Sequence, residues 1–218
     1  IILENRWDIF QKNGEVLKAD YALITQGRIS LPLSKTNTVI GESNLIFLEE
    51  GAKCEASILN TTNGPIYIGK NAEIMEGSIV RGPLALCESA GLKLGTKVYG
   101  PTTLGPHCKV GGEVNNVVFQ AYSNKGHDGF LGNAVIGEWC NLGADTNCSN
   151  LKNNYSTVST YSYETKNTAH TNVQFMGLVM GDHSKSGINT MFNTATVVGV
   201  SANVFGAGFP EKKIDSFS

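Results

Sequence analysis

The chain has 218 residues, a length that suits one large domain, or a domain with an appendage, and is sufficient to bury a full core. Lys and Arg number 17 against 19 Asp and Glu, so the formal net charge is −2 and the basic excess typical of nucleic-acid binding is missing. Gly, Asn and Pro make up about a quarter of the residues. All three are poor in helix interiors, which excludes a mostly helical fold.

The five cysteines are scattered and form no C-x-x-C pair, so we expect reduced thiols and a cytoplasmic protein. No apolar run approaches the ~18 residues needed to cross a bilayer, and the first ten residues lack the features of a signal peptide. We therefore expect neither a membrane nor a nucleic acid as partner. Because the chain starts at Ile1 and stops without an obvious end signal, we also expect it to be a piece of a longer polypeptide.

Residues 15–26 predict a helix, since they lie between Gly14 and Gly27 and place apolar side chains on one face. We interpret residues 1–35 as a lead-in that does not form a domain of its own.

An aliphatic residue then recurs at every sixth position over most of the chain. The central series is Ile68, Ile74, Val80, Leu86, Leu92, Val98, Leu104 and Val110. The same spacing gives Ile40, Ile46, Ala52 and Ile58 upstream, and two blocks downstream, Ile136, Leu142 and Cys148, then Met180, Ser186, Phe192, Val198 and Val204, with a jump in register between blocks. A small residue usually stands two places before each of them.

A spacing of six fits the two-residue alternation of a strand and fits a helical turn poorly. Each hexad is therefore expected to be a short strand and a turn, stacked into a parallel β-solenoid with the aliphatic residues inside. The strands of a β-sandwich recur at 8 to 12 residues, which does not match. The hexads break at roughly 119–134 and 149–177, and we expect two ejected loops there that carry function.

His127 lies in the first interruption, among small residues, and histidine is the side chain best suited to proton transfer near neutral pH. The run G-H-D-G-F-L-G-N-A-V-I-G that starts at Gly126, followed by Asn141-Leu142-Gly143-Ala144, resembles the carboxy-terminal domain of the bifunctional glucosamine-1-phosphate acetyltransferase / N-acetylglucosamine-1-phosphate uridylyltransferase family, with the archaeal-type sugar-1-phosphate enzymes closest. The resemblance spans about residues 100–208.

The resemblance implies an all-β fold, a left-handed parallel β-helix of hexapeptide repeats over 36–208, followed by a tail at 209–218. It makes 1–35 a linker from a nucleotidyltransferase domain and implies a homotrimer with sites between subunits. By the same resemblance His127 is the general base, Asn141 contacts the sugar, and acetyl-CoA is the co-substrate. The residues that would bind acetyl-CoA are Ala144, Asn150, Leu151, Ile188 and Gly206.

Three positions depart from the family pattern. Phe130 stands where the family has Tyr, and Tyr99 and Asn115 stand where it has basic residues that hold the sugar phosphate. Arg81 lies 18 residues before Tyr99, one coil away at about 4.8 Å, and is expected to supply the missing charge. Lys125 and Lys152 are interpreted as solvated surface residues.

No metal is expected. The zinc enzymes with this repeat need two histidines five residues apart, and His107, His127, His170 and His183 contain no such pair. The three histidines outside the motif are interpreted as loop or turn residues: His107, His170 and His183. Trp139 and Phe192 are interpreted as packing residues.

Two hypotheses about function follow. The first is an acetyl-CoA-dependent N-acetyltransferase that acts on an amino-sugar 1-phosphate in UDP-N-acetylglucosamine-type biosynthesis, favoured by His127 and Asn141. The second is a non-catalytic β-helix that trimerises or regulates a sugar-phosphate nucleotidyltransferase, favoured by Tyr99, Asn115 and Phe130.

Overall fold

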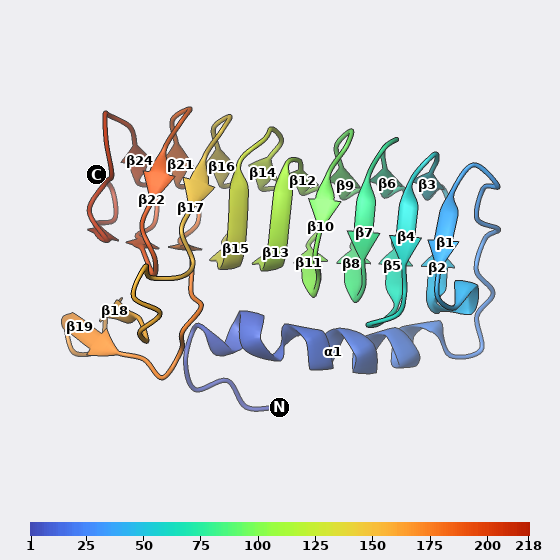
Figure 1. The fold of residues 1–218 in the computed structure, drawn as a ribbon, viewed down its shortest axis with the longest axis horizontal. Helices are drawn as coiled ribbons and strands as arrows, with labels where there is room; N and C mark the ends of the chain where they lie inside the picture. The colour runs from blue at the N-terminus through green and yellow to red at the C-terminus, as the bar shows by residue number, and fades with distance from the viewer.

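The computed structural model describes residues 1–218 and shows one long β-helix with a single α-helix along its side (Figure 1). Almost all strands pair in parallel with the strand one coil away, and they form three faces. The predicted all-β architecture, the hexapeptide-repeat left-handed parallel β-helix, is confirmed.

The three faces are named here in the order in which the chain visits them. The first face consists of β1 (Thr38–Ile40), β4 (Ile58–Asn60), β7 (Ile79–Arg81), β10 (Lys97–Val98), β17 (Asn147–Cys148) and β22 (Met191–Phe192). The second face consists of β2 (Ile46–Leu48), β5 (Ile66–Ile68), β8 (Leu84–Leu86), β11 (Thr102–Leu104), β20 (Val179–Met180), β23 (Val197–Val198) and β25 (Lys213–Ile214). The third face consists of β3 (Lys53–Cys54), β6 (Glu73–Ile74), β9 (Gly91–Leu92), β12 (Lys109–Val110), β14 (Asn124–Lys125), β16 (Asn141–Leu142), β21 (Lys185–Ser186) and β24 (Asn203–Val204).

Two longer strands, β13 (Glu113–Phe119) and β15 (Phe130–Ile136), run from the first face into the second. A short 3-10 helix, η1 (Ser43–Leu45), precedes β2. The tail expected at 209–218 adds β25, which pairs with β23, so the solenoid continues into these residues.

The core confirms the hexad reading over most of the chain. All eight aliphatic residues of the central series are at most 2% exposed, and so is every member of the first downstream block. The upstream block was only partly right, because Ile40 and Ile58 are 46% and 37% exposed. Strand alternation puts their neighbours Val39 and Leu59 inside instead.

The first interruption is not an ejected loop, contrary to the prediction. β14 and β15 lie within 119–136 and pair with the coils on both sides, so the solenoid runs through it. The second interruption does leave the solenoid. It contains the antiparallel hairpin of β18 (Ser159–Ser162) and β19 (Asn167–His170).

The helix α1 (Asp8–Thr25) begins seven residues before the predicted start and includes Gly14. A side chain at Gly14 would meet Pro101 at 3.2 Å, so this glycine allows α1 to pack closely against the second face. At its start, the Asp8 carboxylate accepts the backbone N–H groups of Glu4 and Asn5, at 2.9 and 3.1 Å. α1 lacks the long apolar run of a helix that crosses a membrane.

One corner carries a stack of four rings, from His107, Tyr122, Trp139 and His183. The centroids of Tyr122 and Trp139 are 4.5 Å apart, and all four residues have φ near +60°, a corner conformation. His107 and His183 are corner residues, as predicted, and Trp139 is half exposed and packs within this stack. Phe192 is a core residue.

Candidate functional site

A shortened corner produces the groove that contains His127. Between the third and first faces, four residues separate β9 from β10, β14 from β15, and β16 from β17. Only Gly111 and Gly112 separate β12 from β13. The corner of this one coil is therefore cut back, and a hollow is left between the corners before and after it.

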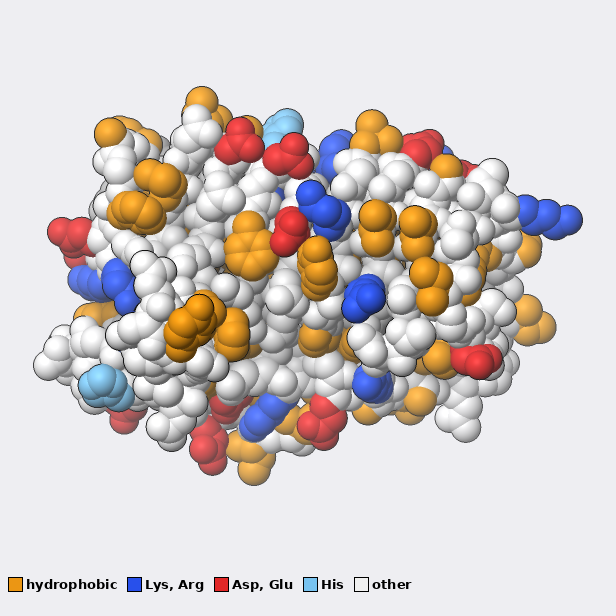
Figure 2. Space-filling view, in the orientation of Figure 1, with side chains coloured by type: hydrophobic (Ala, Val, Ile, Leu, Met, Phe, Trp, Pro, Cys, Tyr) orange, Lys and Arg blue, Asp and Glu red, His pale blue; other side chains and the backbone are white.

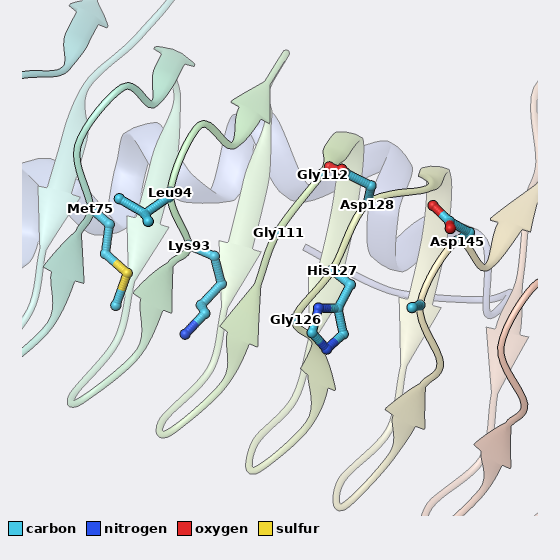
Figure 3. Close-up of a pocket in the computed structure, with 10 residues that line it drawn as sticks. Met75, Lys93, Leu94, Gly111, Gly112, Gly126, His127, Asp128 and Asp145 are labelled. Atoms are coloured by element: carbon cyan, nitrogen blue, oxygen red, sulfur yellow. The ribbon is translucent and has the colours of Figure 1, made fainter.

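This groove has a volume of about 470 Å³. Its lining comes from five consecutive coils: Met75, Lys93, Leu94, Gly111, Gly112, Gly126, His127, Asp128, Ala144 and Asp145. Figure 3 shows the imidazole of His127 and the side chain of Lys93 pointing to the same side, over the glycines, whereas the Asp128 carboxylate points away from the ring. The ring of His127 is exposed and makes no hydrogen bond within the chain, so it is free to bond a ligand.

Four of the predicted residues lie along one line that runs parallel to the axis of the β-helix. Asn124 pairs with Asn141, which puts His127 and Ala144, each three residues later, on equivalent corner positions. Leu142 pairs with Ser186 and Ser186 with Val204, so Ile188 and Gly206 continue the same line. The residue that follows Ile188 donates its N–H to the Ala144 carbonyl at 2.8 Å. This line of small and apolar residues begins at His127 and runs toward the C-terminus.

Phe130 and Asn150 meet on the first face, around the corner from His127. A side chain at Gly132 would lie 2.6 Å from the Phe130 ring and 2.7 Å from the Asn150 amide nitrogen. The same amide donates to the Asn133 side-chain oxygen at 2.8 Å, which fixes its orientation. The absence of a side chain at position 132 therefore allows these two predicted residues to come together.

Arg81, Tyr99 and Asn115 form a row on the outer surface of the first face. Val80 pairs with Val98 and Val98 with Val114, so the three residues occupy equivalent positions on successive coils. The predicted stacking of Arg81 beside Tyr99 is therefore present. Both are exposed, and neither lines the groove of His127.

Apolar side chains surround that row. Ile40, Ile58, Ile79 and Tyr99 project from the first face and are 37–52% exposed. Figure 2 shows hydrophobic groups spread over this face, with a few charged side chains between them. One charged pair is Lys97 and Glu113, whose side chains approach to 4.0 Å. The first face thus presents an open, partly apolar surface next to the groove.

Asn141 and Leu151 lie apart from the groove. Asn141 is exposed at the start of β16, on the third face, whereas Phe130 and Tyr99 belong to the first face. Leu151 begins the ejected segment and lines a separate polar hollow with Lys152 and Asn193. A single chain therefore does not bring all the predicted ligand contacts together.

Lys125 corrects a prediction, because it is not a solvated surface residue. It is 1% exposed, and its ammonium donates to the carbonyl oxygens of Gly111 and His127, both at 2.9 Å. Burial lowers the pKa of Lys125 to about 8, although the carboxylates of Asp128 and Asp145 act in the opposite direction. Lys152, which was also expected in solvent, is half-buried and donates to the Thr157 carbonyl at 2.8 Å.

Sequence reasoning missed Lys93, Asp128 and Asp145, which share the groove with His127. The signal for them is the Gly111-Gly112 pair, after which the next buried aliphatic residue, Val114, comes four positions after Val110 instead of six. That shortened step marks the corner that is cut back. The residues beside it, on the neighbouring coils, are then the residues that line the hollow.

No family model matches the chain. Among curated proteins, residues of this chain are 25% identical over 154 positions to the "Bifunctional protein GlmU" of Trichodesmium erythraeum (strain IMS101). The match covers 70% of this chain and 28% of that protein. The fold of this chain is a β-helix of hexapeptide repeats. The chain spans little more than a quarter of the length of that relative.

Two solved structures are also similar. The polySia specific acetyltransferase NeuO is 10% identical, with 83% of this chain and 76% of that chain covered and a TM-score of 0.36. A hexapeptide transferase family protein from Anaplasma phagocytophilum is 16% identical, with 82% and 74% covered and a TM-score of 0.28.

Proposed function

We propose that the chain is an acyltransferase that moves the acetyl group of acetyl-CoA to the amine of an amino-sugar 1-phosphate. The observation that carries this proposal is the exposed imidazole of His127 in a groove that continues into the line of Ala144, Ile188 and Gly206. Such a line suits a long, flexible thioester substrate, since small side chains leave room for its arm to follow the corner.

In the reaction, the nitrogen of the acceptor amine attacks the thioester carbonyl carbon, and His127 takes the proton that the nitrogen loses. The new C–N bond forms, the C–S bond breaks, and the coenzyme leaves as a thiolate that is then protonated. Because the imidazole has no partner within the chain, its orientation depends on bound substrate or on a neighbouring subunit. Backbone N–H groups at the glycine-rich corners are available to stabilise the oxyanion, typically worth about 3 kcal/mol per donor.

The acceptor is placed between subunits in this proposal. Phe130 and Tyr99 lie on the first face and Asn141 on the third, so contact with one sugar requires the first face of one subunit beside the third face of another. A threefold arrangement supplies three such sites and covers the exposed Ile40, Ile58 and Ile79. Arg81, next to Tyr99, is the basic residue that would meet the phosphate.

The test is release of free CoA thiol from acetyl-CoA in the presence of glucosamine 1-phosphate and a panel of other amino-sugar phosphates. Thiol release that depends on one of these acceptors, with a matching N-acetylated product, supports the proposal. No release with any acceptor favours the second hypothesis, a non-catalytic β-helix that trimerises or regulates a nucleotidyltransferase. The observation that favours this non-catalytic alternative is the presence of Tyr99 and Asn115 where the family has basic residues.

A further inference from the structure

The side chain of Lys125 passes beneath the corner that carries His127. Its ammonium bonds the backbone carbonyl of His127 on its own coil and that of Gly111 on the preceding coil, both at 2.9 Å. A side chain on Gly112 would lie 2.9 Å from this ammonium, so the cut-back corner provides the space that the lysine occupies. Lys125 therefore ties the corner of His127 to the floor of the groove.

Folding alone does not explain a lysine at this position. Most of the other inward residues of the third face, such as Leu92, Val110 and Leu142, are apolar. Val110, on the preceding coil, pairs directly with Lys125. A buried ammonium is more costly to desolvate than an apolar side chain of similar size, and replacing such a charge by an apolar residue is often neutral or stabilising. A charge that weakens the fold, and that joins the backbone of His127 to that of Gly111, is best explained by what it does to His127.

We propose that Lys125 is a positioning residue that holds the backbone of His127 in place, and so fixes the point in the groove from which the imidazole reaches the proton of the substrate. The inference rests on the proposed function for its activity readout. Hydrogen bonds donated by an ammonium are roughly twice as strong as those donated by a neutral amine, so the clamp is tightest when Lys125 is charged. A displacement of about 1 Å at a reacting group can lower a rate by about a hundredfold.

The charges around Lys125 decide how it titrates. Asp128 on its own corner and Asp145 on the next coil favour the charged form, whereas Lys97 on the preceding coil and burial oppose it. The net result is a pKa of about 8. The proposal therefore expects the turnover rate to fall as the pH rises through about 8, where the ammonium loses its charge.

The experiment compares the wild-type protein with Lys125→Met and with the control Lys109→Met. Lys109 is the matched control because it precedes Val110 on the neighbouring coil and donates to one carbonyl, that of Ser89 at 2.7 Å, away from His127. We expect Lys125→Met to lower kcat by at least tenfold, with the KM for acetyl-CoA changed less than about threefold. Its kcat should also lack the fall above pH 8 that the wild type shows, and Lys109→Met should match the wild type throughout.

Two results would overturn the proposal: a kcat of folded Lys125→Met within threefold of wild type, or a wild-type kcat that does not fall between pH 8 and 10. The second result can be measured on the wild type alone, so it tests the proposal even if the Met variant does not fold. If the wild type transfers no acetyl group, the proposed function fails and amide hydrogen exchange of the peptide over 124–131 tests the clamp by itself. Exchange at least tenfold faster in Lys125→Met, but not in Lys109→Met, supports the clamp, and unchanged exchange refutes it.

Discussion

His127 and Ala144 occupy the same corner position on consecutive coils, because Asn124 and Asn141, three residues before each, are paired. The general base of the proposed reaction is thereby aligned with the path of the coenzyme. We expect His127→Ala to lower kcat by ~10²- to 10⁴-fold and to leave acetyl-CoA binding unchanged, since the exposed ring supports no other contact. Steady-state kinetics and calorimetric titration with acetyl-CoA measure the two effects.

The control for that change is His170→Ala. His170 lies in the β18–β19 hairpin and bonds the Ser159 hydroxyl at 3.1 Å, outside the solenoid. It should behave as the wild type. Equal rates for His127→Ala and wild type would remove the general-base assignment.

Gly126 and Gly111 face the same groove but should respond in opposite ways to an added side chain. A Cβ on Gly126 meets nothing within 4 Å, and its φ lies outside the left-handed region. A Cβ on Gly111 would lie 2.8 Å from the carbonyl oxygen of Gly126. We expect Gly126→Ala to keep or slightly raise the melting temperature and Gly111→Ala to lower it.

The larger change Gly126→Leu should fill the groove without disturbing the backbone. Calorimetric titration should then show acetyl-CoA or acceptor binding weakened by at least tenfold, in a protein whose circular dichroism spectrum is that of the wild type. Binding that is undiminished in Gly126→Leu would mean that ligands do not use this groove.

The stability of the protein should depend on pH through Lys125. Its folded-state pKa, about 8, is lower than the value of about 10.4 in an unfolded chain. Between these values the unfolded chain binds more protons, so the free energy of unfolding rises with pH, and the charged lysine is unfavourable below pH 8. Relative to Lys125→Met, the wild type should gain up to about 3 kcal/mol between pH 8 and 10.5.

Urea unfolding of both proteins at four or five pH values measures this difference. Because all other titrating groups are shared, they cancel when the two curves are subtracted. A difference that stays constant across the range would show that the ammonium of Lys125 is not desolvated in the folded protein.

The assembly should be a trimer that uses the first face. Light scattering at micromolar concentration should give about three chain masses, and Ile79→Asp should reduce this to one, because it places a carboxylate in an apolar contact. Leu23→Asp is the control, since Leu23 is 71% exposed on α1, away from this face. A wild-type monomer would exclude a shared site.

The phosphate of the acceptor should depend on Arg81. A charge-assisted contact is typically worth ~1.5 to 3 kcal/mol, so Arg81→Ala should raise the KM for the amino-sugar phosphate by roughly tenfold or more and leave that for acetyl-CoA unchanged. Lys53→Ala, an exposed change on β3 of the third face, is the control. If Arg81→Ala has no effect, Lys93 in the groove becomes the next residue to test.

The periodicity of the sequence predicted the solenoid because each coil repeats the same local pattern of buried and corner residues. An inward aliphatic residue, a preceding small residue and a corner recur every six positions, and burial of these side chains needs only the neighbouring coils. The positions of His127, Ala144, Ile188 and Gly206 on one line follow from the same regularity. Helix α1 was predicted too short, because Gly14 was interpreted as its boundary. The structure places Gly14 inside the helix, where it packs closely against Pro101, a residue far away in the sequence.

The site itself was decided by tertiary structure. A loop was expected at roughly 119–134, whereas the chain shortens one corner by two residues, at Gly111 and Gly112, and continues the solenoid. Only the stacking of coils shows that this cut forms a groove with Lys93, Asp128 and Asp145 on its sides, and that Lys125 fills the space beneath it. A periodic pattern specifies which side chains are inside. Which side chains meet across coils depends on the length of every corner between them.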